Sequence, residues 1–385
     1  MWMGACTSSI GTWMQQLAQA WLVYTLSKDP FYLGLDAFLG QAPIILFSLV
    51  GGVIADRYNR RYLLLISQYV QMACALVLAV LVHYDVVQVW HILCLSFVVG
   101  LAQAFGGPAY LALIPTLVGP EDLENAIALN SIQFNLARVI GPAIGGLALI
   151  KLGATWCFGL NALSFVAVII SLYVIYVRFV PARTSEPMLT SMKQGFGFIR
   201  NQAGMQPLIV LAFCMTVFAF PLMVFLPVFA KEVFQRGPTT YTWFLCCSGI
   251  GSVCGALIVA GWGRLKGQGR TALLNLILLG CLIAGFALSK SVPISCLLLF
   301  CCGAALISVF TMVSSLVQAI TADDMRGRVM SVYNVAFRGG MPVGSLIVGR
   351  LIPRFTAPYT VACSGSVLAA LGIYFLLIHR RIAKL

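Results

Sequence analysis

The amino-acid sequence predicts an all-α integral membrane protein with twelve transmembrane helices in two pseudo-symmetric six-helix halves. Only 9% of its 385 residues are charged and 61% are hydrophobic, whereas about a quarter of a soluble domain is charged. Apolar runs of about 20 residues, long enough to cross a ~30 Å hydrocarbon layer, alternate with short charged clusters. Features of the first half also recur in the second half at a fixed spacing.

The twelve spans are predicted where apolar runs lie between polar or charged residues. These runs are near 2–26, 32–55, 62–83, 89–114, 126–150, 154–178, 207–230, 241–262, 271–290, 294–319, 328–352 and 358–379. Lysines and arginines concentrate on the cytoplasmic side of membrane proteins. Fifteen lie at one set of helix ends and seven at the other. We therefore expect a multi-pass protein of the bacterial plasma (inner) membrane with both termini in the cytoplasm.

The longest loop separates six spans from six and contains Pro181 and Pro187. Its apolar residues recur at helical spacing, which predicts an amphipathic helix on the membrane surface; they are Met188, Met192, Phe196 and Ile199. The predicted organisation is an N-terminal half at 1–178, a cytoplasmic linker at 179–206 and a C-terminal half at 207–385.

The two halves share a pattern at an offset of 200 residues. Three residues of the fifth span match three of the eleventh: Ser131 with Ser331, Arg138 with Arg338, and Pro142 with Pro342. An acidic loop precedes each set. Parallel repeats about an axis normal to the membrane are an architecture of secondary transporters.

The composition argues against several other classes of protein. The net charge of +13 comes from short basic clusters between apolar runs, so no nucleic-acid partner is expected. The thirteen cysteines lie mostly inside apolar runs without metal-ligand spacing, which favours a packing role. No Walker A loop is present and the three histidines support no catalytic triad, so we expect neither an enzyme nor a cofactor or metal site.

The loop between the second and third spans has the pattern Gly52-x-x-x-Asp56-Arg57-x-Asn59-Arg60-Arg61. This pattern resembles motif A of the major facilitator superfamily. Asn59 stands where the family usually has glycine, and we expect the loop to form because asparagine tolerates a left-handed turn. A partial copy at 261–266, after the eighth span, lacks the acid.

The resemblance implies that Asp56 contacts the cytoplasmic end of the eleventh span in one conformation and acts as a switch. That end is a helix N-terminus, where an acid gains roughly 0.3–1 kcal/mol from the helix dipole. Alternatively, the arginines only anchor the loop in the cytoplasm and Asp56 only solubilises it. Under the switch interpretation, Asp56→Asn changes the transport rate and Arg60→Ala has comparatively little effect.

In the fifth span, Gly141-Pro142-Ala143-Ile144-Gly145-Gly146 resembles motif C, which the superfamily associates with drug/proton antiporters. Strings at 11–16, 130–142 and 326–331 resemble the bacterial branch of the enterobactin exporter and the macrolide efflux proteins. Gly141 and Gly145 form a small-residue face for close helix approach, and Pro142 bends the helix. Two interpretations stay open: this helix seals the cavity on one side, or it is a packing seam.

Three charged residues lie inside spans, where each costs at least ~2.5–3.5 kcal/mol near mid-helix unless it is satisfied. Arg138 and Arg338 lie near the midplane and either bind an anionic substrate group or hold the bundle together through carbonyls. Asp36 lies about one turn below the outer surface. It either exchanges protons, as a proton-coupled exporter requires, or caps a helix N-terminus in the headgroup region.

Polar residues follow the first and tenth spans at helical spacing. In the resembling family, spans one, four, seven and ten line the cavity, so these side chains are expected to face it unless they only bond neighbouring helices. The candidates for substrate contact or coupling, taken with the charged residues above, are Gln16, Gln103, Asn135, Thr311 and Ser315, with Tyr110 beside them. Aromatic residues of span seven are expected on another wall: Phe213, Phe218, Phe220 and Phe225.

These features predict a monomeric secondary active transporter, embedded in membrane lipids, that works by alternating access of its two halves. We expect it to export an amphipathic organic solute, drug-like or siderophore-like, in exchange for protons. If Asp36 couples nothing, the protein is a uniporter. Two alternatives are a lipid or lysolipid flippase on the same fold and a non-transporting membrane receptor or scaffold.

Overall fold

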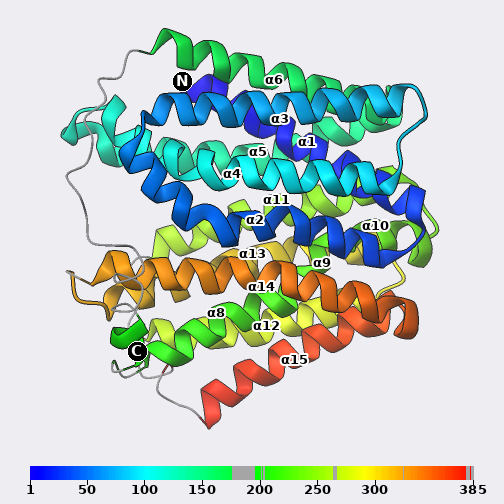
Figure 1. The fold of residues 1–385 in the computed structure, drawn as a ribbon. Coiled ribbons are helices and arrows are strands. Elements are labelled where there is room, and N and C mark those ends of the chain that lie inside the picture. The colour runs from blue at the N-terminus through cyan, green and yellow to red at the C-terminus, as the bar shows by residue number, and fades with distance from the viewer. Residues whose placement is uncertain are drawn as a thin grey trace. The chain divides into compact units, whose positions relative to one another are not determined.

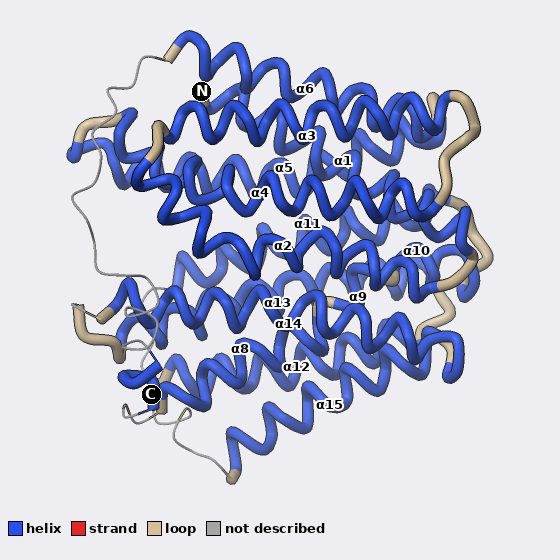
Figure 2. Tube along the Cα trace, viewed as in Figure 1, coloured by secondary structure: helices blue, strands red, loops and turns tan. Residues whose placement is uncertain are grey.

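A computed structural model describes residues 1–175, 196–200, 202, 204–262, 267–323, 325–378 and 382. Nearly all of these residues are helical, and no strand occurs among them (Figure 2). The chain divides into two compact units, Met1–Ser185 and Glu186–Leu385, which are described separately below. Most of the linker expected at 179–206, with its amphipathic helix, falls outside the described residues and stays a prediction.

Unit 1 contains one long helix for each predicted span of the first half (Figure 1). The helices are α1 (Trp2–Ser27), α2 (Pro30–Arg57), α3 (Arg60–His83), α4 (Val89–Leu117), α5 (Leu123–Lys151) and α6 (Ala154–Val174), with a 3-10 turn η1 (Pro120–Asp122) before α5. The residues around its first turn explain where α2 begins. Asp29 begins α2, because its Oδ1 accepts a hydrogen bond from the Phe31 amide at 2.9 Å and Pro30 follows at the first helical position.

Unit 2 has the same order of helices, except that its first span is broken. The elements are α8 (Met205–Ala219), α9 (Pro221–Val224), α10 (Leu226–Val228), a π-helical turn η2 (Phe229–Val233), α11 (Pro238–Trp262), α12 (Gln268–Leu288), α13 (Val292–Ala319), α14 (Arg326–Phe355) and α15 (Ala357–Leu377). Pro221 and Pro227 stand at the breaks, because proline has no amide hydrogen and cannot continue the i to i−4 ladder.

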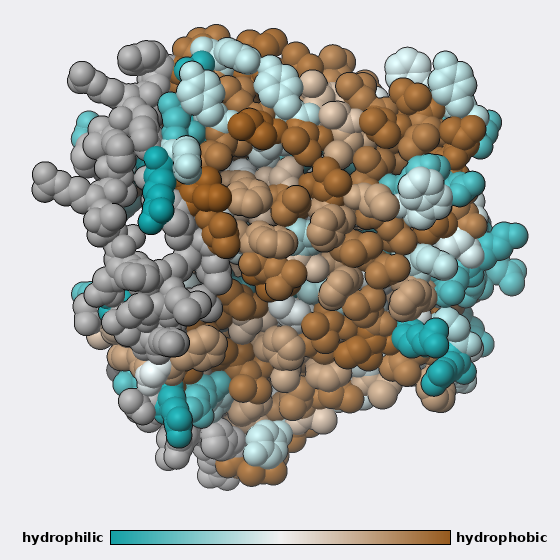
Figure 3. All heavy atoms as spheres, viewed as in Figure 1, coloured by the Kyte–Doolittle hydropathy of each residue, from teal (hydrophilic) through white to brown (hydrophobic). Residues whose placement is uncertain are grey.

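Eleven helical segments of the described residues are long and apolar enough to cross a membrane. The remaining long helix, α1, is 26 residues long but carries several polar side chains, which lower its mean hydropathy. Figure 3 shows hydrophobic side chains over the middle of the helices and hydrophilic ones gathered toward their ends. This distribution is expected for helices surrounded by lipid.

Corresponding helices pair in the same way within each unit. In unit 1 the main pairs are α1 with α5, α2 with α4, and α3 with α6. In unit 2 they are α8 with α14, α11 with α13, and α12 with α15. The repeat that the sequence shows only at a few positions is therefore a repeat of helix packing.

Candidate transport site

A carboxylate in unit 1 is held by polar side chains from two other helices. Gln19 of α1 donates from Nε2 to both carboxylate oxygens of Asp36 in α2, at 3.1 Å and 3.0 Å. Ser96 of α4 donates from Oγ to Asp36 Oδ1. These bonds satisfy an acid inside a spanning helix, where water is scarce. Asp36 therefore does not cap α2, as one interpretation of the sequence supposed; Asp29 has that role.

The hydrogen bonds continue from this carboxylate into α6. Gln15 Nε2 donates to Gln19 Oε1 at 3.5 Å, and Asn161 Nδ2 donates to Gln15 Oε1 at 2.7 Å. Ser164 Oγ donates to Asn161 Oδ1 at 3.1 Å. We call these residues, with Asp36 and Ser96, the Asp36 network. It joins α1, α2, α4 and α6, so a change of charge on one carboxylate acts on four helices.

The two intramembrane arginines differ in their surroundings. Arg138 of α5 is partly buried, and within the described residues it has neither a hydrogen-bond nor an ion-pair partner. Arg338 of α14 is exposed and likewise lacks such a partner in that part of the chain. Among the residues that the structure describes, Arg138 makes none of the carbonyl contacts that a purely structural role requires. A positive charge near mid-helix without a partner in this part of the chain favours an anionic ligand group.

Two of the three motif A arginines, Arg60 and Arg61, bind backbone carbonyls near helix ends. Arg60 Nη1 donates to Ala112 O of α4 at 2.9 Å and its Nε to Ala55 O at 3.3 Å. Arg61 donates from Nε to the last turn of α6, at Leu172 O, over 2.6 Å. The expectation that Arg60→Ala does little is therefore revised, because this side chain ties α3 to α4 and to the end of α2.

The remaining motif A residues lie at the end of α2 and the start of α3. Gly52 is partly buried in α2, Arg57 is the exposed last residue of that helix, and the side chain of Asp56 lies outside what the structure describes. Asn59 is extended, with φ −62°, so the loop between α2 and α3 is built here without a left-handed residue at this position. Its side chain instead accepts a hydrogen bond from the Arg61 amide at 3.0 Å and begins α3 as an N-cap.

The motif C glycines lie against the backbone of α1. A Cβ atom at Gly141 would contact the Trp13 side chain and come within 2.9 Å of Ile10 O, and one at Gly145 would lie 2.9 Å from Met14 Cα. Pro142 and Gly146 are buried beside them. Motif C is therefore a close-packed seam between α5 and α1.

Unit 2 repeats this seam between α14 and α8. A Cβ atom at Gly340 would lie 2.6 Å from Phe213 O and would contact Thr216, and one at Gly344 would contact Val217 O. Close approach of backbones is thus built into the same helix pair in both units. Gly340 and Gly344 of α14 thus correspond to Gly141 and Gly145 of α5.

Two residues expected in the cavity bond neighbouring helices instead. Gln103 of α4 donates to Gln71 Oε1 of α3 at 3.3 Å. Tyr110 of α4 donates to Asn130 Oδ1 of α5 at 2.9 Å, and to Gln133 at 3.4 Å. Their contacts favour the alternative of helix-to-helix bonding.

Other candidates are free to meet a solute. Gln16 and Ser315 are exposed, and Thr311 is exposed while its hydroxyl bonds a carbonyl of its own helix. Asn135 is partly buried and donates to a carbonyl one turn earlier in α5. Phe225, expected on a cavity wall, is instead fully buried because the chain is broken there and packs inward.

Sequence reasoning missed several of the groups that the structure brings together. Ser96 and Asn161 are polar residues in mostly apolar helices, and that contrast was the available signal. An aromatic cluster next to Arg338 was also missed: Phe310 and Phe337 have ring centroids 4.6 Å apart, and Tyr333 stacks on Phe337 at 6.1 Å. Among the described residues, no group of side chains could hold a metal ion.

The seams and the helix pairing can now be compared with known proteins. A family model described as transmembrane secretion effector matches residues 1–384. The chain belongs to this family of the major facilitator superfamily. The resemblance found in motifs A and C is thereby confirmed, and the transmembrane secretion effector family consists of transporters rather than enzymes.

Relatives and solved structures agree with this membership. The staphyloferrin A transporter of Staphylococcus aureus is 24% identical over 381 residues, covering 97% of this chain and 94% of the relative. The enterobactin exporter EntS of Escherichia coli is 27% identical over 362 residues, covering 92% and 85%. The nucleoside transporter NupG superposes with a TM-score of 0.72 at 13% identity, covering 98% and 99%. A bacterial homologue of the lysosomal transporter Spinster gives 0.73 at 13%, covering 99% and 96%. The predicted major facilitator fold is confirmed.

Proposed function

We propose that this chain exports an amphipathic organic solute, drug-like or siderophore-like, by alternating access and in exchange for protons. The observation that carries the proposal is the Asp36 network. It places one carboxylate, bonded to Gln19 and Ser96, inside the spanning helices of unit 1. The names of two relatives, a staphyloferrin A transporter and an enterobactin exporter, support a siderophore-like solute and outward transport.

Proton exchange at Asp36 couples to helix packing through its hydrogen bonds. The ionised carboxylate accepts from Gln19 and Ser96, and charge-assisted bonds of this kind are about twice as strong as neutral ones. Protonation converts one oxygen into a donor and weakens these contacts. The hydrogen bonds that join α1 to α2 and α4 then weaken, which changes the relative populations of two conformations of the transporter.

The solute is proposed to meet two arginines and three exposed polar residues. Arg138 supplies a positive charge for an anionic group, while the exposed Gln16, Thr311 and Ser315 offer hydrogen bonds and Arg338 a second positive charge. Asp56 is proposed to switch between conformations through the N-terminal end of α14. We further propose a monomer with both termini in the cytoplasm.

A transport assay with an imposed pH gradient tests the proposal. Purified protein in proteoliposomes is offered a panel of siderophore-like and drug-like solutes, with wild type beside Asp36→Asn. Wild type is expected to move at least one solute faster when the gradient is imposed, and the variant is expected to bind that solute but lose the acceleration. Acceleration retained in Asp36→Asn contradicts the proton role, and movement of no solute by wild type contradicts the transport proposal.

A further inference from the structure

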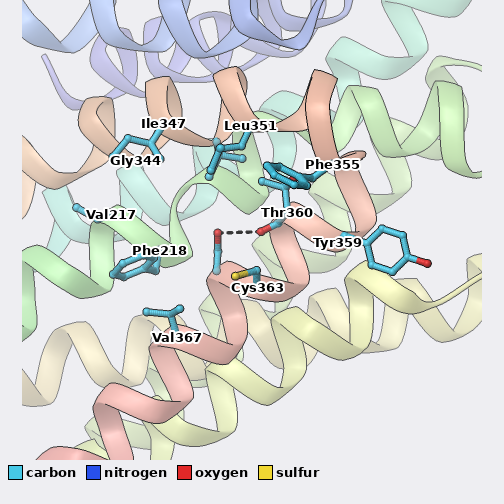
Figure 4. Close-up of a pocket in the computed structure, with 12 residues that line it drawn as sticks. Val217, Phe218, Gly344, Ile347, Leu351, Phe355, Tyr359, Thr360, Cys363 and Val367 are labelled. Carbon is cyan, nitrogen blue, oxygen red and sulfur yellow. Dashed lines mark hydrogen bonds between the residues drawn. The ribbon is translucent and has the colours of Figure 1, made fainter.

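A cavity of ≈ 440 Å³ lies within unit 2, between α8, α14 and α15 (Figure 4). It is lined by Val217, Phe218, Gly344, Ile347, Val348, Leu351, Phe355, Tyr359, Thr360, Cys363, Ser364 and Val367. The threonine and serine hydroxyls of the lining are occupied by their own helix, because Thr360 Oγ1 donates to Thr356 O at 2.8 Å and Ser364 Oγ donates to Thr360 O at 3.1 Å. The crevice, as we call this cavity, therefore offers a ligand an apolar wall.

The crevice lies where unit 2 departs from unit 1, because α8 packs less extensively on α15 than α1 packs on α6. Met14 of α1 faces Gly145, and Val217 of α8 faces Gly344, which corresponds to Gly145. Equivalent positions of α1 and α8 are therefore 203 residues apart. In unit 1, a Cβ atom at Gly11 would lie 2.5 Å from both Asn161 Oδ1 and Ser164 Oγ, so α1 packs closely along α6. The residue 203 positions after Gly11 is Cys214. A cysteine at this position is larger than glycine, in keeping with the less extensive packing of α8 on α15.

The dimensions of the crevice match one leaflet of a bilayer. Its lining extends from Phe355 and Tyr359, at the turn between α14 and α15, to Gly344 on α14 and Val367 on α15. At 1.5 Å per residue these stretches are about 16 Å and 12 Å long. Half of a ~30 Å hydrocarbon layer is about 15 Å.

The exposed side of the crevice is apolar, and a positively charged residue, Arg354, lies at the end next to the α14–α15 turn. Ile347, Phe355 and Val367 are exposed at spanning depth, where the neighbour is hydrocarbon. Arg354 follows Leu351 by three positions and so lies on the crevice side of α14; it is exposed and has no hydrogen-bond or ion-pair partner in the described part of the chain. Positive charge at this end is unexplained by the orientation rule, because these helix ends are the less basic set.

We propose that the crevice binds one acyl chain of an anionic phospholipid, from the leaflet at the α14–α15 turn, with the lipid phosphate paired to Arg354. An acyl chain fits an apolar wall of leaflet depth, and a guanidinium pairs with phosphate in two-pronged geometry. The exposed Tyr359 lies at the outer edge of the crevice, at the level where aromatic side chains meet headgroups (Figure 4). This site is independent of the solute and of proton exchange.

Photolabelling by a lipid tests the acyl-chain site. The full chain is reconstituted in phosphatidylethanolamine vesicles with a trace of phosphatidylglycerol carrying a mid-chain diazirine, and adducts are mapped by mass spectrometry. Adducts are expected to concentrate on crevice peptides. Val367→Trp, which fills the crevice, is expected to reduce them several-fold, whereas Leu278→Trp, at similar depth on the exposed face of α12, leaves them unchanged. Thermal midpoints in detergent establish that both variants are folded.

A second arm tests the headgroup. Arg354→Gln is expected to reduce labelling by the phosphatidylglycerol probe several-fold more than labelling by a phosphatidylcholine probe with the same chain, and Lys290→Gln, exposed at the same end of unit 2, changes neither. Equal effects on both probes overturn the phosphate contact. Labelling spread evenly over lipid-exposed helices, cross-links between two copies at the crevice, or displacement of the probe by a transported solute overturns the acyl-chain site.

Discussion

Adjacent glycines in α14 allow the close seam between α14 and α8 to be tested with one matched pair of variants. A Cβ atom at Gly340 would lie 2.6 Å from Phe213 O, while one at Gly339 would meet nothing within 4 Å. Alanine raises intrinsic helix stability over glycine by up to about 1 kcal/mol at either position. The two substitutions therefore share the backbone effect and differ only in the seam.

The geometry sets the size of the difference. Ordinary contact begins at 3.4 Å, so the α8 backbone must move by about 0.8 Å to admit the new methyl group at Gly340. A gap of 0.5–1 Å forfeits about a quarter to a half of the dispersion energy of each separated atom pair. Overpacking of this kind costs about 1–3 kcal/mol. We expect Gly340→Ala to be less stable than Gly339→Ala by that amount, and Gly339→Ala to be unchanged or slightly more stable than wild type.

Thermal unfolding of the two purified variants in one detergent measures this difference. For domains of this size, 1 kcal/mol corresponds to about 2–4 °C in the midpoint, so Gly340→Ala is expected to unfold several degrees below Gly339→Ala. Equal midpoints, or a higher midpoint for Gly340→Ala, would refute the close seam. Gly141→Ala is expected to behave like Gly340→Ala, because its methyl group would meet Ile10 O of α1.

Three further predictions follow from contacts of single side chains. Gln19→Leu removes the donor to the Asp36 carboxylate and should lower the free energy of unfolding by about 1.5–3 kcal/mol. As a control, Gln16→Leu, at an exposed residue, should leave the unfolding midpoint unchanged. Arg61→Gln removes a bond to the end of α6 and should increase proteolysis near that end, while Arg57→Gln, exposed and without such a bond, serves as the control. Arg138→Leu should unfold at the same temperature as wild type or higher, because a charge inside a spanning helix is removed. The same variant should abolish uptake of the solute in proteoliposomes. A thermal midpoint below that of wild type would show a structural role instead.

The spans were predictable because lipid imposes a length and a polarity on each helix. The ends of the observed helices fall within a few residues of the apolar runs, and the caps at Asp29 and Asn59 mark two of the starts. The break in the seventh span was not predicted. Its prolines, Pro221 and Pro227, were visible in the sequence, but prolines within spans also occur in unbroken helices such as α2, with Pro43.

The site was less predictable because polar contacts depend on rotation about the helix axis. Gln16 was expected to face the cavity from spacing alone, yet it is its neighbours Gln15 and Gln19 that join the Asp36 network, while Gln16 is exposed. Neighbouring residues are about 100° apart around a helix. Which of them reaches Asp36 depends on how α1 packs against α2, and composition carries no information about that.

The same rotation separates the two arginines that the sequence repeat had paired. Gly141 and Gly340 occupy equivalent places in the two seams and are 199 positions apart. Arg138 and Arg338 are 200 positions apart. Relative to its seam, Arg338 is therefore turned by about 100°, which agrees with its exposure while Arg138 is partly buried. Because the two side chains are turned differently from their seams, they do not face equivalent directions within their units. The two arginines are therefore proposed to contact different groups of a solute, and each role needs its own variant.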